Sequence, residues 1–386
     1  MRNALAARRD IHVTATSRVR IDSHRLPAAH LRDDSDSDPG RIDMATVDEA
    51  EAHGLAALLY FVLRRRGALD AVSPAVRSRL HDLARQSALV DELRARDLRE
   101  VVATLGASGI RPLIFKGAAL AATHYAEPWL RTRGDTDVLV RRAEADRVGA
   151  LLQHRGLKRL PRPRGRLVTQ QARYDGVRGG IPIAYDVHWR VADPHVFADA
   201  LPYAELARDA VADHPSGARR LSNVHALAVA CLHRAAHHYD APHLGLLYDV
   251  HLLADGLTSS EWQSFGDWAE RARMRVVSLR ALSLATDVFG CVVPADVRVR
   301  LESAGLGSEP SAVFVAPGRN GRPLRRFDVL LSDLRALGSM RDGAALVRQH
   351  LFPGREYVAA AADDRSAAPR YVARIARGVA AWFEPL

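Results

Sequence analysis

The chain has 386 residues, 48% of them hydrophobic, and a formal net charge of +10. This length is enough for a large buried core and for two domains. Its two cysteines, Cys231 and Cys291, exclude a disulfide framework and a cysteine-based zinc site. Apolar runs are too short for a membrane span and the start lacks a signal-peptide core, so we expect a cytoplasmic protein without a membrane partner. The positive charge indicates an anionic partner, such as a nucleotide or a nucleic acid.

The N-terminal part of the chain predicts a tail followed by helices. Residues 1–43 mix Arg and Asp without a helical or strand period, which is typical of disorder. Residues 46–66 have a helical pattern. Ser73 and Pro74 supply an N-cap and a first-turn proline for a long helix whose apolar positions continue to Leu105.

From about residue 111 the pattern indicates a small α/β sheet. We expect strands at 113–115, 138–140, 167–174 and 181–189, with helices from 118 and over 142–154. After residue 200 the pattern is helical, with helices at 223–238, 245–255, 261–274, 276–289 and 369–383 and a Gly/Pro-rich loop at 305–323. We therefore predict an α+β fold with a disordered tail at 1–43, an α/β domain with N-terminal helices at 44–200 and a helical domain at 201–386.

Two carboxylates open the second predicted strand. Asp135 and Asp137 are two residues apart, so in a strand both side chains point to the same side. Two neighbouring anions are costly unless a cation lies between them, and Mg²⁺ is the natural one. Arg131, Arg133 and Gly134 stand just upstream and suggest phosphate chemistry. Each arginine is either a phosphate clamp or an ordinary loop residue, and we favour the clamp for Arg131.

Lys116 and Gly117 close the first predicted strand and open a helix. A helix N-terminus offers unpaired N–H groups and a partial positive charge, and glycine lets a phosphate approach the backbone. Lys116 is one of two lysines, with Lys158, among 55 basic residues. In a chain that uses arginine almost by default, a lysine suggests a need for a compact ammonium.

The last predicted strand carries a third carboxylate. Its odd positions from Ile181 to Trp189 are large and apolar, so period two places Asp186 and His188 on the opposite face. The strand is either a half-exposed edge strand or one that brings Asp186 beside Asp135 and Asp137. Three carboxylates suit phosphoryl or nucleotidyl transfer with two Mg²⁺ ions, and Asp186 can also accept the proton of an attacking hydroxyl. His188 would orient the acceptor or this carboxylate.

These motifs together resemble a bacterial family of uncharacterised nucleotidyltransferases of the DNA-polymerase-β-type superfamily. The residues that carry the resemblance are Lys116-Gly-Ala-Ala-Leu120, Arg131, Gly134-Asp-Thr-Asp137 and Asp186-Val-His-Trp189, and it continues through His233–His237 and Leu246–Val250. It implies a small mixed nucleotidyltransferase sheet flanked by helices, with Asp135, Asp137 and Asp186 as metal ligands and a C-terminal helical domain over the nucleotide. Lys116-Gly117 departs from the Gly-Ser or Gly-Gly usual in the superfamily, and we assign the added charge to the triphosphate.

Other polar residues in the sequence allow either a functional or a structural interpretation. His233 and His237, at i and i+4, either bind a metal or serve helix packing or interdomain hydrogen bonds, and without a third ligand the second interpretation is favoured. Asp249 lies in an apolar helix and needs a partner, so an ion pair is expected. A basic cluster is either an RNA-binding patch or a solvated loop, and the lack of interleaved aromatics favours the loop. It comprises Arg155, Lys158, Arg159, Arg162, Arg164 and Arg166.

The sequence thus predicts a Mg²⁺-dependent nucleotidyltransferase that uses an NTP such as ATP. It would transfer NMP to a hydroxyl or phosphate of a small molecule, a peptide or protein, or an RNA end. A non-catalytic nucleotide- or partner-binding scaffold and a kinase-like transfer of the terminal phosphate are the alternatives.

Overall fold

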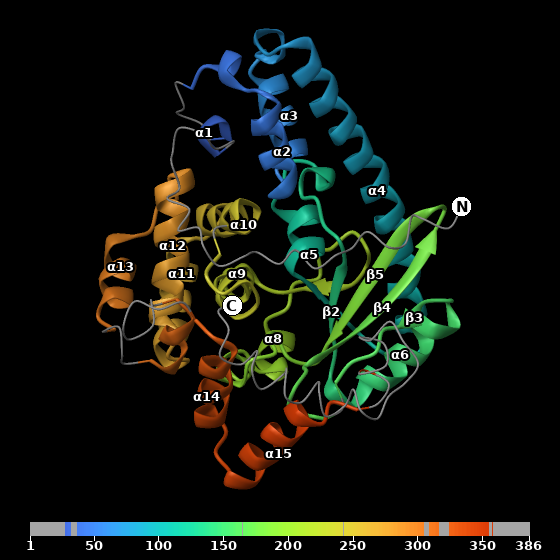
Figure 1. The fold of residues 1–386 in the computed structure, drawn as a ribbon, viewed down its shortest axis with the longest axis vertical. Helices are drawn as coiled ribbons and strands as arrows, with labels where there is room; N and C mark the ends of the chain where they lie inside the picture. The colour runs from blue at the N-terminus through green and yellow to red at the C-terminus, as the bar shows by residue number, and fades with distance from the viewer. Residues whose placement is uncertain are drawn as a thin grey trace.

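The computed structural model of the protein describes residues 28–31, 37–163, 165–241, 243–304, 309–315, 324–354 and 357. Its architecture is α+β, with one six-stranded mixed sheet between two groups of helices (Figure 1). The predicted fold class is confirmed. Among the described residues, every helix is too short or too polar to traverse a lipid bilayer.

The sheet has the strand order β3-β4-β5-β2-β1-β6. Its strands are β1 Leu113–Phe115, β2 Thr136–Leu139, β3 Lys158–Arg159, β4 Gln171–Arg178, β5 Ile181–His188 and β6 Arg219–Arg220. β2 pairs with β5, and β1 with β6, in parallel, while the other neighbours are antiparallel. β4 starts later than expected, and the two-residue strands β3 and β6 were not predicted.

The strand β5 lies inside the sheet, between β4 and β2. It is joined to β4 by Gly179 and Gly180, which both have positive φ, as a tight two-residue hairpin requires. Ile183, Tyr185 and Val187 pack in the core on one face, so Asp186 and His188 face the other side. The predicted two-faced pattern is confirmed, and the alternative of a half-exposed edge strand is wrong.

The N-terminal helices frame one end of the sheet. They are α2 Met44–Ala52, α3 Ala56–Arg65 and α4 Pro74–Ala107, followed between strands by α5 Lys116–Thr123 and α6 Ala145–His154. In α4, Ser73 accepts a hydrogen bond from the Val76 N–H and Pro74 occupies the first turn, as expected. The single helix predicted at 46–66 is divided at Gly54, whose φ of +71° ends α2.

The remaining helices lie mainly on the far side of the sheet from α4. They are α7 His195–Ala198, α8 Tyr203–Arg208, α9 Asn223–His238, α10 Leu244–Asp255, α11 Ser259–Arg271, α12 Arg275–Phe289, α13 Ala295–Glu302, α14 Arg326–Ala336 and α15 Met340–Leu351. Within the expected loop at 305–323, residues Pro310–Phe314 form a 3₁₀ helix. The helix predicted at 369–383 lies outside the described residues.

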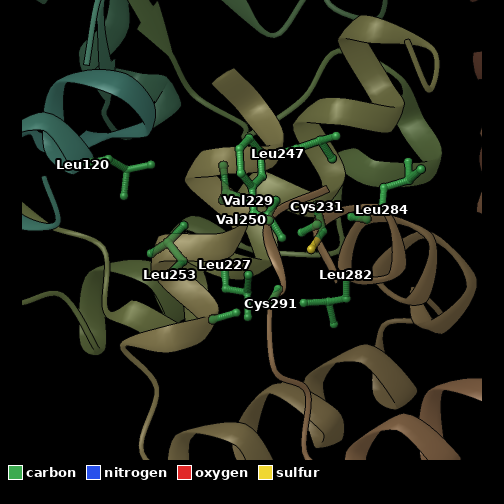
Figure 2. Packing of buried hydrophobic residues seen from close by; sticks show 14 of the residues in the cluster. Leu120, Leu227, Val229, Cys231, Leu247, Val250, Leu253, Leu282, Leu284 and Cys291 are labelled. Carbon is green, nitrogen blue, oxygen red and sulfur yellow. The ribbon is translucent and has the colours of Figure 1, made fainter. Parts of the chain in front are cut away.

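Two hydrophobic clusters hold these layers together. The smaller one packs α4 and α6 against one face of the sheet. The larger one joins α2 and α3 to α9–α12 and includes Leu227, Leu247, Val250 and Leu282 (Figure 2). This core crosses the boundary predicted at 200/201, so helices from both parts of the chain share one buried interior.

Part of the segment expected to be disordered is ordered. Ala28–Leu31 forms a short helix, α1, and Pro39–Arg41 a 3₁₀ turn. Leu31 and Ile42 are buried in the larger core cluster, and Asp43 caps α2 by accepting a hydrogen bond from the Thr46 N–H. Because Arg and Asp are so frequent in this segment, the sequence pattern did not show that Leu31 and Ile42 are buried. The rest of residues 1–36 lies outside the described residues.

Candidate active site

A cavity of about 810 Å³ lies between one face of the sheet and the helices α5, α9 and α10. Eight of the nine residues predicted for the site line it: Lys116, Gly117, Arg131, Arg133, Gly134, Asp135, Asp137 and Asp186. The ninth, His188, is hydrogen-bonded to Asp137. The structure therefore brings together residues that are up to about seventy positions apart in the chain.

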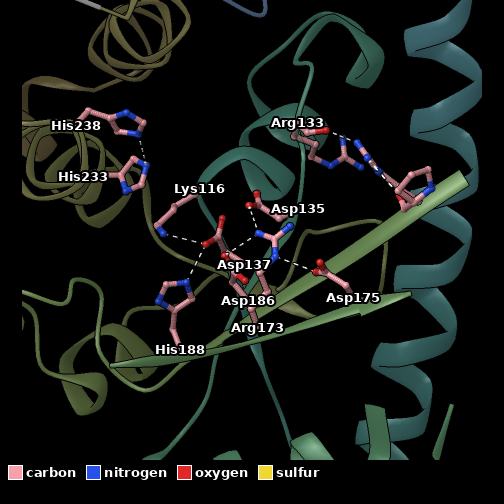
Figure 3. A network of polar contacts seen from close by, with 12 residues as sticks. Lys116, Arg133, Asp135, Asp137, Arg173, Asp175, Asp186, His188, His233 and His238 are labelled. Carbon is pink, nitrogen blue, oxygen red and sulfur yellow. Dashed lines mark hydrogen bonds and ion pairs between the residues drawn. The ribbon is translucent and has the colours of Figure 1, made fainter. Parts of the chain in front are cut away.

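Strand register fixes the carboxylates on one side of the sheet. Asp137 of β2 is paired with Asp186 of the parallel strand β5, so both side chains point to the same face. They are 6% and 9% exposed. Ligand atoms of Asp137, Asp186 and His188 all lie within 4.8 Å of one another. Asp135 is outside that group but reaches the same guanidinium as Asp186 (Figure 3).

Lys116 and His188 both contact Asp137. Lys116 Nζ lies 2.8 Å and His188 Nε2 2.9 Å from the same oxygen, Oδ1. Burial alone would raise the pKa of Asp137, but Lys116 and His188 hold it well below its usual range. Lys116 begins α5 with a φ of +52°, a conformation that a residue with a side chain rarely adopts. Such backbone strain is typical of functional sites.

Arg173 of β4 is a site residue that the sequence did not reveal. Its Nη1 lies 3.4 Å from Asp135 Oδ2 and 3.7 Å from Asp186 Oδ2, and its Nε donates to Asp175 Oδ1 at 2.8 Å. The antiparallel register places it directly opposite Asp186. The Gly179-Gly180 turn sets this register, so it is the feature of the sequence from which the position of Arg173 could have been predicted.

Asp186 is the least compensated of the three carboxylates. Burial and the charges of Asp135 and Asp137 raise its pKa to about 7, against the opposing effect of Arg173 and Lys116. Its Oδ1 is buried and has no hydrogen-bond partner. A buried carboxylate oxygen without a partner, among other carboxylates, is a donor set that fits a hard divalent cation such as Mg²⁺.

The two arginines before Asp135 are engaged in buried ion pairs. Arg131 donates from Nε and Nη2 to both oxygens of Asp249 at 2.7–3.1 Å, and the Tyr125 hydroxyl donates to Asp249 at 2.8 Å. Arg133 is paired with Asp91. The ion pair expected for Asp249 is confirmed. A phosphate clamp by Arg131 or Arg133 stays a prediction. All three guanidinium nitrogens of Arg131 already donate to acceptors, whereas the buried Nε of Arg133 has no partner.

The two glycines of the predicted phosphate site have room for a side chain. A Cβ on Gly117 would come 3.6 Å from the Arg133 Cβ, an ordinary contact, and one on Gly134 would meet nothing within 4 Å. Packing therefore does not explain Gly117. It lies on the cavity wall at the start of α5, and a close approach of a phosphate to the backbone there stays a prediction.

Four histidines from α9 and the turn after it, His233, His237, His238 and His243, line the cavity opposite the carboxylates. The Nε2 atoms of His233 and His238 are 3.3 Å apart. Burial, followed by the charge of Lys116, lowers the pKa of His237 to about 3. In the described part of the chain, no third metal-ligating side chain joins His233 and His237, and the role of this pair stays a prediction.

The basic cluster at 155–166 is partly bound into the fold. Arg155 contacts Asp97 and Glu100, Arg166 is paired with Asp342, and Arg162 lies 5.0 Å from the Trp189 ring. Lys158 and Arg159 are exposed on β3, and Arg164 lies outside the described residues. Half of the cluster is thus held by contacts within the fold, and both the RNA-binding and the solvated-loop interpretations stay predictions.

Comparison with known proteins places the chain in a family. The model of a family described as uncharacterised nucleotidyltransferase matches residues 44–290. The matched part includes the whole sheet, the carboxylates, Lys116 and the cavity helices α9 and α10. No curated protein matches the chain. From the extent of the match, the chain belongs to this family of uncharacterised nucleotidyltransferases.

Proposed function

We propose that the protein is a Mg²⁺-dependent nucleotidyltransferase that transfers NMP from an NTP to an acceptor hydroxyl or phosphate. The observation that carries the proposal is the pairing of Asp137 with Asp186 across β2 and β5, on the wall of the cavity that Lys116 and Gly117 also line. Family membership supports nucleotidyl transfer. The metal, the nucleotide and the acceptor are our inference.

Asp135, Asp137 and Asp186 would hold the metal ions. Bound Mg²⁺ supplies charge stabilisation for the triphosphate and lowers the pKa of an attacking hydroxyl. Lys116 is placed to leave Asp137 and contact a phosphate, since its ammonium lies at the cavity wall. Gly117 lines the same cavity at the start of α5, and its lack of a side chain would let a phosphate approach the first N–H groups of the helix.

Asp186 would serve as the proton acceptor. A carboxylate that contacts the attacking hydroxyl can take its proton during the reaction. The acceptor oxygen forms a bond to the α-phosphorus as the bond to the pyrophosphate oxygen breaks. The acceptor proton passes to the carboxylate of Asp186.

A scaffold without activity is the main alternative. Three carboxylates close together are unfavourable without a ligand to balance them. Lys116 contacts only Asp137 closely, and Arg173 lies 3.4 Å and 3.7 Å from Asp135 and Asp186, so two cations stand against three carboxylates. A non-catalytic protein would have no need for this arrangement, which favours the enzyme.

The test is transfer of label from α-³²P-NTPs in cell extract with Mg²⁺. We expect wild-type protein to label an acceptor and Asp137→Ala to label none, because Asp137 would ligate the metal. Asp146→Ala, which removes an exposed carboxylate on α6, is the matched control and should remain active. Transfer from γ-labelled NTP alone would identify a kinase. Nucleotide binding without transfer of either label would identify a scaffold.

A further inference from the structure

The four cavity histidines, which we call the histidine wall (His233, His237, His238 and His243), present unused hydrogen-bonding atoms. His233 Nδ1, His237 Nε2 and His243 Nδ1 are buried and have no partner. Buried polar atoms are nearly always hydrogen-bonded, so each exception needs an explanation. Three such atoms on one wall of one cavity indicate that the wall receives a polar ligand.

The electrostatic surroundings of the wall favour an anion. Burial is the main reason that the pKa values of His233, His237 and His238 are low, and in all three the charge of Lys116 is the next cause. His233 and Lys116 both line the cavity, and their side chains point to the same space (Figure 3). The other strongly basic groups on the cavity wall, Arg131, Arg133 and Arg220, are already paired with Asp249, Asp91 and Asp213. Lys116 is paired as well, with Asp137, but its charge still acts on the wall more strongly than any other. The wall therefore offers uncharged N–H donors beside a positively charged side chain.

We propose that His233 and His237, together with Lys116, form the subsite for the pyrophosphate part of the bound NTP. This inference rests on the proposed function, which places the α-phosphate at the carboxylates. Lys116 Nζ contacts Asp137, and its charge also acts on the histidine wall. We therefore place the β- and γ-phosphates, which follow the α-phosphate in the NTP, between Lys116 and this wall. Imidazole N–H groups donate to phosphate oxygens, and the departing pyrophosphate would be held there as its charge grows.

The contact between His233 and His238 prepares one of these donors. At 3.3 Å, one Nε2 donates a proton to the other. When His238 donates, His233 Nε2 accepts, and the proton of His233 is then on Nδ1, the buried atom without a partner. His238 is thus a positioning residue that selects the tautomer able to donate to a phosphate.

The test compares three ligands by calorimetry on the whole chain in the presence of Mg²⁺: inorganic pyrophosphate, an NTP and the corresponding NMP. In the double variant His233→Ala/His237→Ala, we expect affinity for pyrophosphate and NTP to fall at least about tenfold, as for lost hydrogen bonds to a charged group. Affinity for NMP should stay within about twofold of wild type. His154→Ala, at the exposed end of α6, is the control.

His237→Gln keeps an N–H donor and guards against misfolding of the double variant, so its loss of pyrophosphate affinity should be the smaller. Unchanged pyrophosphate binding in the double variant, or an equal loss for NMP and NTP, would overturn the inference, and the second result would assign the wall to base or sugar. In either case transfer by wild type, and its loss in Asp137→Ala, would leave the proposed function standing. If wild type bound none of the three ligands, the proposed function itself would fail and this subsite with it.

Discussion

Arg173 determines how the carboxylate cluster is balanced in the described structure. It bridges Asp135 and Asp186 from one side, while Lys116 contacts Asp137 from the other. A guanidinium stays protonated at any ordinary pH, so its charge remains when a metal ion arrives. Asp175, which already accepts from Nε at 2.8 Å, offers a second anchor on the same strand.

The variant Arg173→Gln should therefore bind divalent cations more tightly. Removing a fixed positive charge a few ångströms from the metal is expected to raise Mn²⁺ affinity at least about tenfold. In metal-free buffer the same variant should melt about 3 °C lower, because the carboxylates lose a counter-ion. Calorimetry with Mn²⁺ and thermal melting measure the two effects. Arg159→Gln, exposed on β3, should change neither, and weaker Mn²⁺ binding by Arg173→Gln would mean that the arginine supports the metal site.

The positions of some site residues could be predicted from the sequence and those of others could not. Asp137 and Asp186 were predictable because period two fixes a side for each residue and a buried strand must pair with its neighbour. Arg173 was not, since its place depends on the β4–β5 register, which follows from the Gly179-Gly180 turn. The ion pair between Arg131 and Asp249 could not be predicted either, because it joins residues 118 positions apart in the chain.

At the scale of elements, Asp249 joins α10 to the segment between α5 and β2. It accepts hydrogen bonds from Arg131 and Tyr125, both of which precede β2. These groups are largely buried, with side chains of Arg131 and Asp249 14% and 6% exposed. A buried pair of this kind is strongly weakened when one partner is removed, because the other charge is left uncompensated.

We expect Asp249→Asn to lower the free energy of unfolding by about 3 kcal/mol. Urea denaturation followed by circular dichroism measures this change. Asp255→Asn, near the exposed end of the same helix, is the control and should cost less than about 1 kcal/mol. Equal effects of the two variants would show that the Arg131 pair does not stabilise the fold.

A pH-dependent contact links α14 to α7. Asp333 Oδ1 accepts a hydrogen bond from the His195 N–H at 2.6 Å. Burial, with some repulsion from Asp193, raises the pKa of Asp333 to about 7, although backbone N–H groups of His195 and Val196 oppose the shift. An aspartate in the unfolded chain titrates near pH 4. The folded protein therefore holds this proton between about pH 4 and pH 7.

The stability that Asp333 contributes should be complete below about pH 4 and lost as the pH rises to about 7, by at most about 4 kcal/mol. Denaturation midpoints measured across this range for wild type and Asp333→Asn test the sign. The asparagine variant should lack this part of the slope, while Asp146→Asn should keep it. A wild-type stability that rises with pH because of Asp333 would contradict the prediction.

Elements with strong local signals were predicted most accurately. α4 has a capping serine, a first-turn proline and a long apolar stripe, and its predicted start is the observed one. β3 and β6 have two residues each, which is too short for a period to be visible. The break between α2 and α3 depends on the positive φ of Gly54, which a helical pattern of apolar residues does not show.

At the scale of the whole molecule, the cavity lies where the sheet meets α9 and α10. A ligand there contacts both, so its binding should stabilise the entire folded chain. The fold class followed from the order of predicted strands and helices. The shared core of α2, α3 and α9–α12 did not, because sequence patterns show which faces are apolar and not which faces meet.

Thermal melting with Mg²⁺-ATP checks this expectation. At a ligand concentration of 100 times Kd, binding to the folded state adds about 2.7 kcal/mol of stability, which should raise the wild-type Tm by several degrees. Asp137→Ala should show no such rise, and Asp146→Ala should behave as wild type. An equal rise in wild type and Asp137→Ala would mean that Asp137 does not hold the metal.

The Arg131–Asp249 pair also limits how this chain can be recombined with its relatives. A chimera that takes its sheet from one parent and its later helices from another inherits only one member of the pair unless both parents carry it. Such a hybrid would bury either Arg131 or Asp249 without its partner, and this would destabilise it even if all its other contacts were preserved. Exchanging both positions as a unit is thus a precondition for a stable chimera.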